Sequence, residues 1–162
     1  MKIDDLDLKL LGLLSRNGRI SSAEMARTIG VSERTVSNHV SRLIDEGVIS
    51  IVGFIDRGFF GYNVVADIYC LVEDADMEDI AREIAKFDEV SYVAISFGDR
   101  DISVQVFAKS PQDVKEFVQK KLAPLPGIAR TTTVILPTVI KEIYEWKPIE
   151  IEMAAGQEPR NP

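Results

Sequence analysis

The fold of the N-terminal third is decided by residues 21–44, which read SSAEMARTIGVSERTVSNHVSRLI. Ser21 opens a helix with a capping-box signal, and Gly30 can adopt the left-handed conformation that ends it. After only one more residue, Ser32 caps a further helix, which Gly47 is placed to end. Two helices joined this tightly form a helix-turn-helix.

The helix that follows Ser32 has two faces of different composition. Val36, Val40, Leu43 and Ile44 recur at helical spacing and predict a buried apolar stripe. The other face carries short polar and basic side chains, which can bind phosphates and base edges in a major groove. A small helical domain whose third helix simply faces water is the alternative. The candidate DNA-binding residues are Arg27, Ser32, Arg34, Thr35, Ser37, Asn38, Ser41 and Arg42.

The segments on either side of this motif predict a helix and a strand. Residues 6–14 hold leucines at helical spacing, with Asp5 as the expected N-cap and Asn17-Gly18 as the expected end. Residues 48–55 are rich in β-branched side chains and predict a strand that leads through a turn into a linker. The N-terminal domain is therefore expected to resemble a winged helix.

The second half of the chain changes to near-continuous apolar runs, which predict strands at residues 64–72, 90–97, 102–108 and 128–144, the last broken by Pro137. Apolar residues at helical spacing predict one helix between the first two strands and another between the last two. The order βαββαβ is that of a ferredoxin-like fold, with both helices on one face of an antiparallel sheet. The bare face is expected to be covered by a second subunit.

The fold class is therefore α+β, with two domains. The predicted boundaries are residues 1–50 for the helix-turn-helix domain, 51–62 for the strand and linker, 63–148 for the ferredoxin-like ligand-sensing and oligomerisation domain, and 149–162 for a disordered tail.

Composition and charge narrow the class of protein. The net charge of −7 lies in residues 63–162, whereas the first 62 residues are neutral and concentrate arginine between Arg27 and Leu43, where a phosphate-facing surface is expected. Early acidic residues and the lack of a long apolar run predict a cytoplasmic protein without membrane contact. With one histidine, His39, and one cysteine, Cys70, no metal site, disulfide or cofactor is expected.

The turn between the two central strands is a candidate ligand site. Gly98 allows close backbone approach, and Asp99 or Asp101 can receive an ammonium group. A turn that needs a positive φ would explain Gly98 without any ligand. Thr131 and Thr133 point to one face of the last strand, where they can bind a carboxylate or merely pair across the sheet.

Several short segments occur in a specific order over residues 3–147. They are LDLKLL at 6–11, NGRIS at 17–21, ARTIGV at 26–31, SERTV at 32–36, RLIDEGVI at 42–49, GY at 61–62, GDRD at 98–101 and RTTT at 130–133. Together they resemble the Lrp/AsnC family, the leucine-responsive or feast/famine transcriptional regulators of bacteria and archaea.

The resemblance implies which molecules the protein binds and how its binding to DNA is regulated. Double-stranded DNA would be bound at pseudo-palindromic sites by dimers that associate into tetramers or octamers. An amino acid would bind between subunits, at the turn holding Gly98, Asp99 and Asp101 and at strand positions Thr131 and Thr133. Its binding would bias assembly and hence DNA occupancy.

Two other functions stay open at this point. Siroheme decarboxylases resemble these regulators in fold, but the second half of this chain has no histidine for acid–base chemistry, so no enzymatic activity is expected. An architectural DNA-binding protein that responds to no effector is the second alternative.

Overall fold

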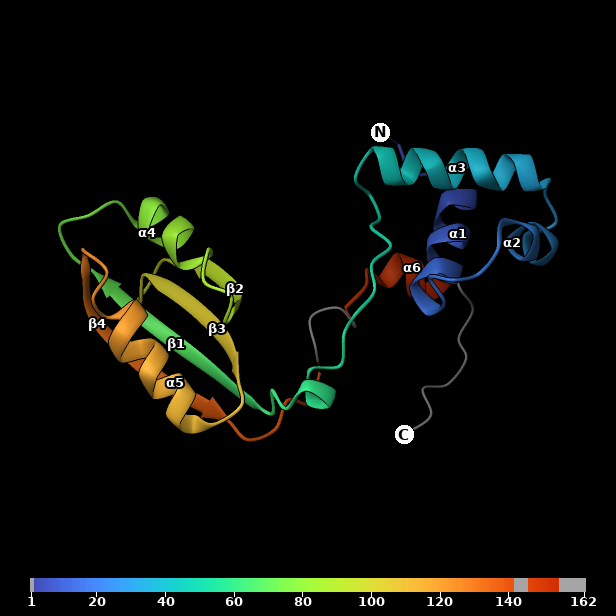
Figure 1. Ribbon diagram of the computed structural model, residues 1–162. Helices are drawn as coiled ribbons and strands as arrows, with labels where there is room; N and C mark the ends of the chain where they lie inside the picture. Colours follow the sequence, from blue (N-terminus) through green and yellow to red (C-terminus); the bar gives the residue numbers. More distant parts are fainter. Residues whose placement is uncertain (1, 142–145, 155–162) are drawn as a thin grey trace. The chain divides into compact units, whose positions relative to one another are not determined.

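The computed structural model describes residues 2–141 and 146–154, and the chain divides into two compact units (Figure 1). Of the described residues, the first unit holds 2–54, 141 and 146–154, and the second holds 55–140. Residues 141 and 146–148, which the sequence predicts to lie in the second domain, therefore belong to the first unit.

The first unit is built on three helices, α1 (Asp5–Arg16), α2 (Ser22–Ile29) and α3 (Glu33–Asp45). The side chains of Ser21 and Ser32 cap α2 and α3, which confirms the helix-turn-helix. The apolar stripes of the three helices meet in one small core made of Leu10, Leu14, Met25, Ala26 and Val36.

The cap of α1 differs from the prediction. Asp4, not Asp5, is the N-cap, because its side chain accepts a hydrogen bond from the Asp7 backbone while the Asp7 side chain accepts one from the Asp4 backbone. This reciprocal capping box requires a residue three positions before Asp7, and Asp5 is already the first helical residue.

The strand predicted for residues 48–55 is not formed. A strand needs a neighbour for its backbone hydrogen bonds, and none of the described residues of this unit supplies one. The β-branched side chains stay exposed, with 64% of Val52 and 78% of Ile55 accessible. A short 3₁₀ helix, η1 (Arg57–Phe60), follows and leads into the second unit.

The first part of the tail that the sequence predicts to be disordered forms a helix. Residues Ile149–Ala154 form α6, which lies beside α1 in the first unit (Figure 1). The prediction was wrong for this part, since residues 149–154 alone are too few to show a long amphipathic period. The rest of the predicted tail, residues 155–162, and the end of the last predicted strand, residues 142–144, lie outside the described residues.

The second unit contains a four-stranded antiparallel sheet. Its strands are β1 (Val64–Val72), β2 (Val90–Ile95), β3 (Ile102–Ala108) and β4 (Ile128–Leu136), in the order β2-β3-β1-β4. This order confirms the ferredoxin-like fold. The last strand ends immediately before Pro137, which has no N–H to donate to a ladder.

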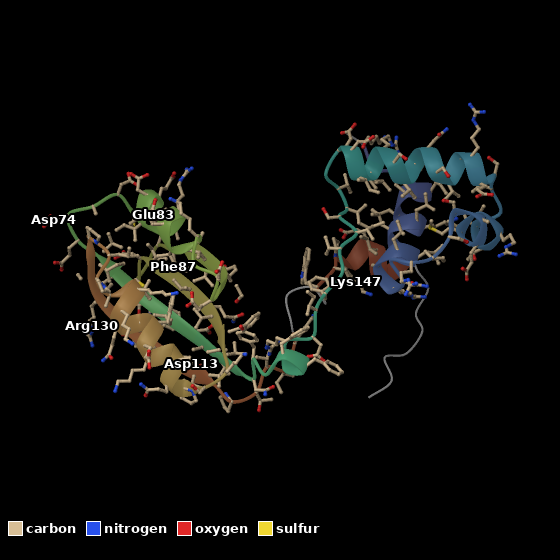
Figure 2. All side chains as sticks on the ribbon, viewed as in Figure 1. Asp74, Glu83, Phe87, Asp113, Arg130 and Lys147 are labelled. Carbon is tan, nitrogen blue, oxygen red and sulfur yellow. The ribbon has the colours of Figure 1, made fainter. Side chains whose placement is uncertain are left out.

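Two helices cover one face of this sheet, α4 (Met77–Ile84) and α5 (Pro111–Phe117), and α5 continues into one π-helical turn, η2 (Val118–Leu122). Phe87, labelled in Figure 2, meets Phe117 edge to face with ring centroids 5.6 Å apart. The core between helices and sheet is made of Ala66, Ile68, Cys70, Ile80, Ile84, Ile102, Val104, Val106, Ala108, Val114, Phe117 and Leu122.

Among the described residues of this unit, no helix covers the opposite face of the sheet. Strand register places Asp67, Tyr69 and Leu71 of β1 on this open face, beside Val134 of β4. Exposed apolar side chains remain there, including 42% of Val134 and 48% of Tyr92. The bare face that the sequence predicted is therefore present.

Candidate DNA-binding surface and effector site

α3 carries the central DNA-binding candidates on the side turned away from its buried stripe. Val36 and Leu43 are fully buried, whereas Arg34, Asn38 and Ser41 are exposed. At 100° per residue, these three side chains lie within about 30° of the direction opposite the two buried residues Val36 and Leu43. The structure therefore gathers a guanidinium, an amide and a hydroxyl on one surface of one helix, where they can reach phosphates and base edges.

The remaining candidates lie around this surface. Ser37 is exposed on its flank, and Arg27 is exposed in the last turn of α2. Ser32 and Thr35 serve the start of α3, because the Ser32 hydroxyl accepts from the Thr35 backbone N–H at 3.1 Å and bonds the Thr35 hydroxyl at 2.7 Å. These two hydroxyls stabilise the helix start, and both stay close to the surface.

Arg42, the last candidate, turns toward α1. Its Nη2 donates to both carboxylate oxygens of Asp7, at 2.6 and 2.7 Å. His39 Nδ1 lies 2.8 Å from the same carboxylate. The Asp7 side chain is completely buried, and 40% of the Arg42 side chain is exposed. One buried carboxylate thus holds two side chains of α3 against α1.

This ion-pair cluster sets the charge state of Asp7. Burial alone would raise the pKa of the carboxyl, but hydrogen bonds from His39, from the Asp4 backbone and from Arg42, together with the Arg42 charge, hold that pKa below its ordinary value of 3.8. Potential ligand atoms of Asp4, Asp7 and His39 lie within 4.8 Å of one another. Because Arg42 already contacts both Asp7 oxygens, a metal ion there would face a fixed positive charge.

Sequence reasoning missed the role of Asp7. A signal was present, because Asp7 falls on the inner side of α1, with Leu10, Leu11 and Leu14 three, four and seven positions later. An acidic residue within such a stripe requires a buried partner, and the partners were available at helical spacing on α3. Spacing alone could not say which basic side chain would reach it.

The turn between β2 and β3 differs from the prediction in one respect. Gly98 is not among the residues with positive φ, so the turn does not require glycine for its backbone. Asp101 is hydrogen-bonded within the protein. Its carboxylate accepts from the Val72 backbone N–H at 2.7 Å, and its own backbone N–H donates to the Cys70 carbonyl. Asp99, by contrast, is 92% exposed.

The two threonines of β4 lie near this turn. Thr131 pairs with Cys70 and Thr133 pairs with Ile68, so both point to the helix-covered face of the sheet. Asp101 contacts the other side of Cys70 through its backbone. The structure thus places Asp101 and Thr131 on either side of one β1 residue, with Thr133 farther along the edge strand.

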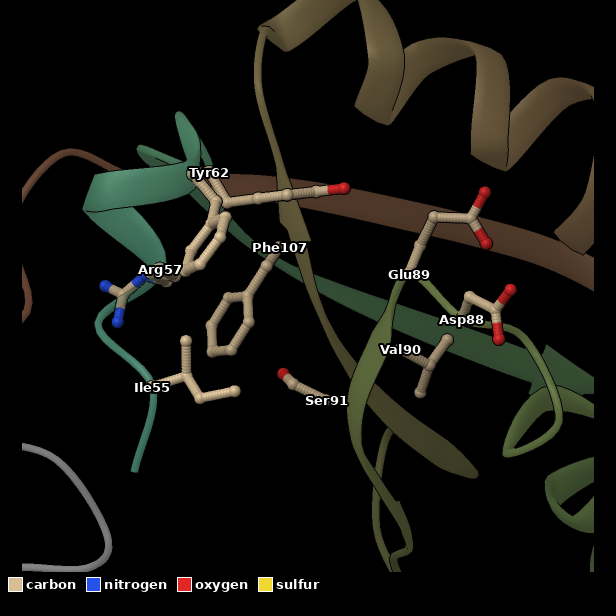
Figure 3. Close-up of a pocket in the computed structure, with 9 residues that line it drawn as sticks. Ile55, Arg57, Tyr62, Asp88, Glu89, Val90, Ser91 and Phe107 are labelled. Atoms are coloured by element: carbon tan, nitrogen blue, oxygen red, sulfur yellow. The ribbon is translucent and has the colours of Figure 1, made fainter. Parts of the chain in front are cut away.

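A separate cavity of about 510 Å³ lies beside η1 (Figure 3). The Arg57 guanidinium stacks 4.7 Å from the Phe107 ring centroid, and carboxylates of Asp88 and Glu89 lie on the other side of that ring in the view. None of the five effector candidates lines this cavity. Its lining residues are Ile55, Arg57, Phe60, Tyr62, Asp88, Glu89, Val90, Ser91 and Phe107.

Comparisons with known proteins match both units of the chain. Residues 3–50 match a model of winged helix-turn-helix DNA-binding domains, and residues 64–146 match the Lrp/AsnC ligand binding domain. Within the part of the chain that the structure describes, no helix has the length and hydropathy needed to cross a membrane.

Relatives and solved structures agree with these matches. An uncharacterized HTH-type transcriptional regulator of Pyrococcus horikoshii is 39% identical over 89% of this chain and 92% of its own. AsnC of E. coli is 25% identical, with a TM-score of 0.81 over 89% of this chain and 99% of its own. A transcriptional regulator of Neisseria meningitidis in complex with L-Met has the same fold, at 22% identity and a TM-score of 0.81 over 87% and 94% of the two chains.

The matches cover both domains in the order in which the structure presents them, and relatives are named as regulators rather than enzymes. The chain belongs to the Lrp/AsnC family of DNA-binding transcriptional regulators.

Proposed function

We propose that this regulator binds pseudo-palindromic DNA in the cytoplasm as a dimer or a larger assembly, and that an amino acid alters its DNA occupancy. The observation that carries the proposal is the pairing of two features in one chain. One is the exposed polar face of α3, and the other is a ferredoxin-like unit of the ligand-binding type whose open sheet face is left uncovered.

Self-association is supported by the composition of the open face. Leu71, Tyr92 and Val134 leave apolar surface in solvent on this face, and exposed apolar surface of this kind is typical of a protein interface. Two copies joined by a two-fold axis would present two α3 helices, so the DNA site would carry the same symmetry. The assembly beyond the dimer, a tetramer or an octamer, is part of the proposal.

Replacing Arg34 by alanine is expected to weaken binding to the preferred duplex by about 1–3 kcal/mol, because one cationic contact to a base or phosphate is lost. Fluorescence anisotropy with a duplex selected from a random pool measures the change. Arg82→Ala is the matched control, since Arg82 is an exposed arginine on α4 in the other unit. Equal affinity of Arg34→Ala and the unmodified protein would remove Arg34 from the DNA contact.

The effector site that we propose is the turn holding Gly98, Asp99 and Asp101 together with Thr131 and Thr133. The exposed Asp99 carboxylate suits an ammonium group, and a threonine hydroxyl suits a carboxylate. Asp101 would act by holding the turn, since one of its carboxylate oxygens already accepts a hydrogen bond from the Val72 backbone N–H. The Neisseria relative in complex with L-Met supports an amino acid as the class of ligand.

Native mass spectrometry with a panel of amino acids, with and without the selected duplex, tests this proposal. The expected result is a shift in assembly or DNA occupancy with one amino acid, which Asp99→Ala or Thr131→Val abolishes. Asp74→Ala is the control, as an exposed aspartate outside the site. Discrete DNA binding that no amino acid alters would instead indicate an effector-independent regulator, and uniform coverage of DNA would indicate an architectural protein.

A further inference from the structure

The buried carboxylate of Asp7 is the one polar group in the core of the first unit's described part, and it connects α1 to the recognition helix α3. Both of its oxygens have partners, supplied by Asp4, His39 and Arg42. An ionised group enclosed in this way contributes little net stability compared with an apolar side chain, but it can fix a single arrangement of the elements that it joins.

The two α3 partners of Asp7 are placed to fix the rotation of the helix. His39 and Arg42 are three residues apart, so they lie one above the other on one flank of α3. The hydrophobic effect that buries the apolar stripe is not directional, whereas hydrogen bonds weaken steeply when their angles change. Two directional contacts one turn apart therefore define which way Arg34, Asn38 and Ser41 point.

The orientation of Arg42 agrees with this role. Its Nη2 is bonded to Asp7, and its Nε is shielded from solvent with no hydrogen-bond partner among the described residues. Two of the three guanidinium nitrogens are thus either bonded to Asp7 or shielded from solvent. Among the eight residues that the sequence singles out for DNA binding, Arg42 is the one whose guanidinium is held by a buried acid.

We propose that Asp7 is a positioning residue for DNA recognition, and that Arg42 and His39 act through Asp7 by setting the rotation of α3 rather than by contacting DNA. Hydrogen-bonding side chains read bases only within narrow limits of distance and angle, so a small rotation of α3 weakens base readout. Contacts to the phosphates tolerate it better because they depend mainly on charge. The inference rests on DNA binding through α3 and is independent of the amino-acid effector.

The test uses the full chain and two duplexes, one selected from a random pool and one of unrelated sequence, over a series of salt concentrations. Asp7→Asn and Arg42→Gln are each expected to weaken binding to the selected duplex by about 10-fold or more, the loss of one good base contact. Binding to the unrelated duplex and the slope of affinity against salt stay unchanged. The double variant is expected to bind no more weakly than either single variant, because both changes break the same link.

Three outcomes would overturn the proposal. A salt slope that falls by about one in Arg42→Gln, with losses that add in the double variant, would make Arg42 a direct phosphate contact. An equal loss on both duplexes would mean that Asp7 only keeps the domain folded. Unchanged affinity of both variants would remove the link from recognition altogether. If Asp7→Asn does not fold, Arg42→Gln supplies the test, since 40% of the Arg42 side chain is exposed, no apolar core residue is changed and Asp7 keeps its contacts with His39 and the Asp4 backbone.

Discussion

Replacing Gly127 by alanine is expected to destabilise the ferredoxin-like unit by about 2–4 kcal/mol, through backbone strain and overpacking together. Gly127 has a φ of +90°, which side chains with a Cβ rarely adopt. A Cβ at this position would lie 2.5 Å from the Ala75 Cβ and 2.8 Å from the Ile80 Cδ1. Ile80 cannot move freely because it belongs to the core. The segment that leads to Ala75 is held close to Gly127 because the Glu73 backbone N–H donates to the Gly127 carbonyl.

Urea unfolding followed by far-UV circular dichroism measures this effect, and Gly98→Ala is the matched control. Gly98 has no positive φ, and a Cβ there would meet nothing within 4 Å. The control is expected to change the free energy of unfolding by less than about 0.5 kcal/mol. Similar losses in both variants would mean that the Gly127 environment is looser than the structure indicates.

The contrast between these two glycines shows where sequence reasoning reached its limit. Both are followed by a strand, but only the Gly98 turn attracted a prediction, because it joins two adjacent strands and is flanked by acids. Positive φ at Gly127 arises from the way the chain passes from η2 to β4 under Ala75 and Ile80. Contacts of this kind depend on packing between distant segments, which local patterns do not encode.

Elements with a strong local signal were predicted well. The bounds of β1 and β3 agree with their apolar runs, and Ser21 and Ser32 cap the helices that they were expected to cap. The strand predicted for residues 48–55 is not formed, although its local signal was also strong. Their β-branched composition satisfies strand propensity, but a strand also needs a neighbour, and propensity carries no information about that.

The sequence predicted which α3 side chains of the candidate site are exposed, but not which candidate side chains are already bonded to other parts of the protein. The exposed residues Arg34, Asn38 and Ser41 followed from the helical period of α3 alone. The engagement of Arg42 with Asp7 depends on how α1 crosses α3, and the commitment of Asp101 to Val72 depends on sheet register. Both are tertiary facts, and both change which side chains are available to a ligand.

Asp7→Asn is expected to lower the free energy of unfolding of the first unit by about 2–3 kcal/mol at pH 7. Removing one partner of a buried ion pair has a large effect, which is reduced here because Arg42 and His39 retain access to water. Urea unfolding followed by tryptophan fluorescence measures it, since the chain's one tryptophan, Trp146, belongs to this unit.

The dependence of this difference on pH follows from the lowered pKa of Asp7. A carboxyl whose pKa is lower in the folded than in the unfolded chain stabilises the fold above its unfolded value, near 3.8, and loses that contribution as pH falls through the folded value. The difference between the unmodified protein and Asp7→Asn should therefore be full at pH 6–7 and shrink below about pH 4. Glu116→Gln is the matched control, because hydrogen bonds from Lys120 and Gln112 also lower the pKa of the Glu116 carboxyl, but in the other unit and at the surface. A difference that stayed constant from pH 7 to pH 3 would show that Asp7 acts by shape alone, and that the carboxylate charge does not hold α3 in place.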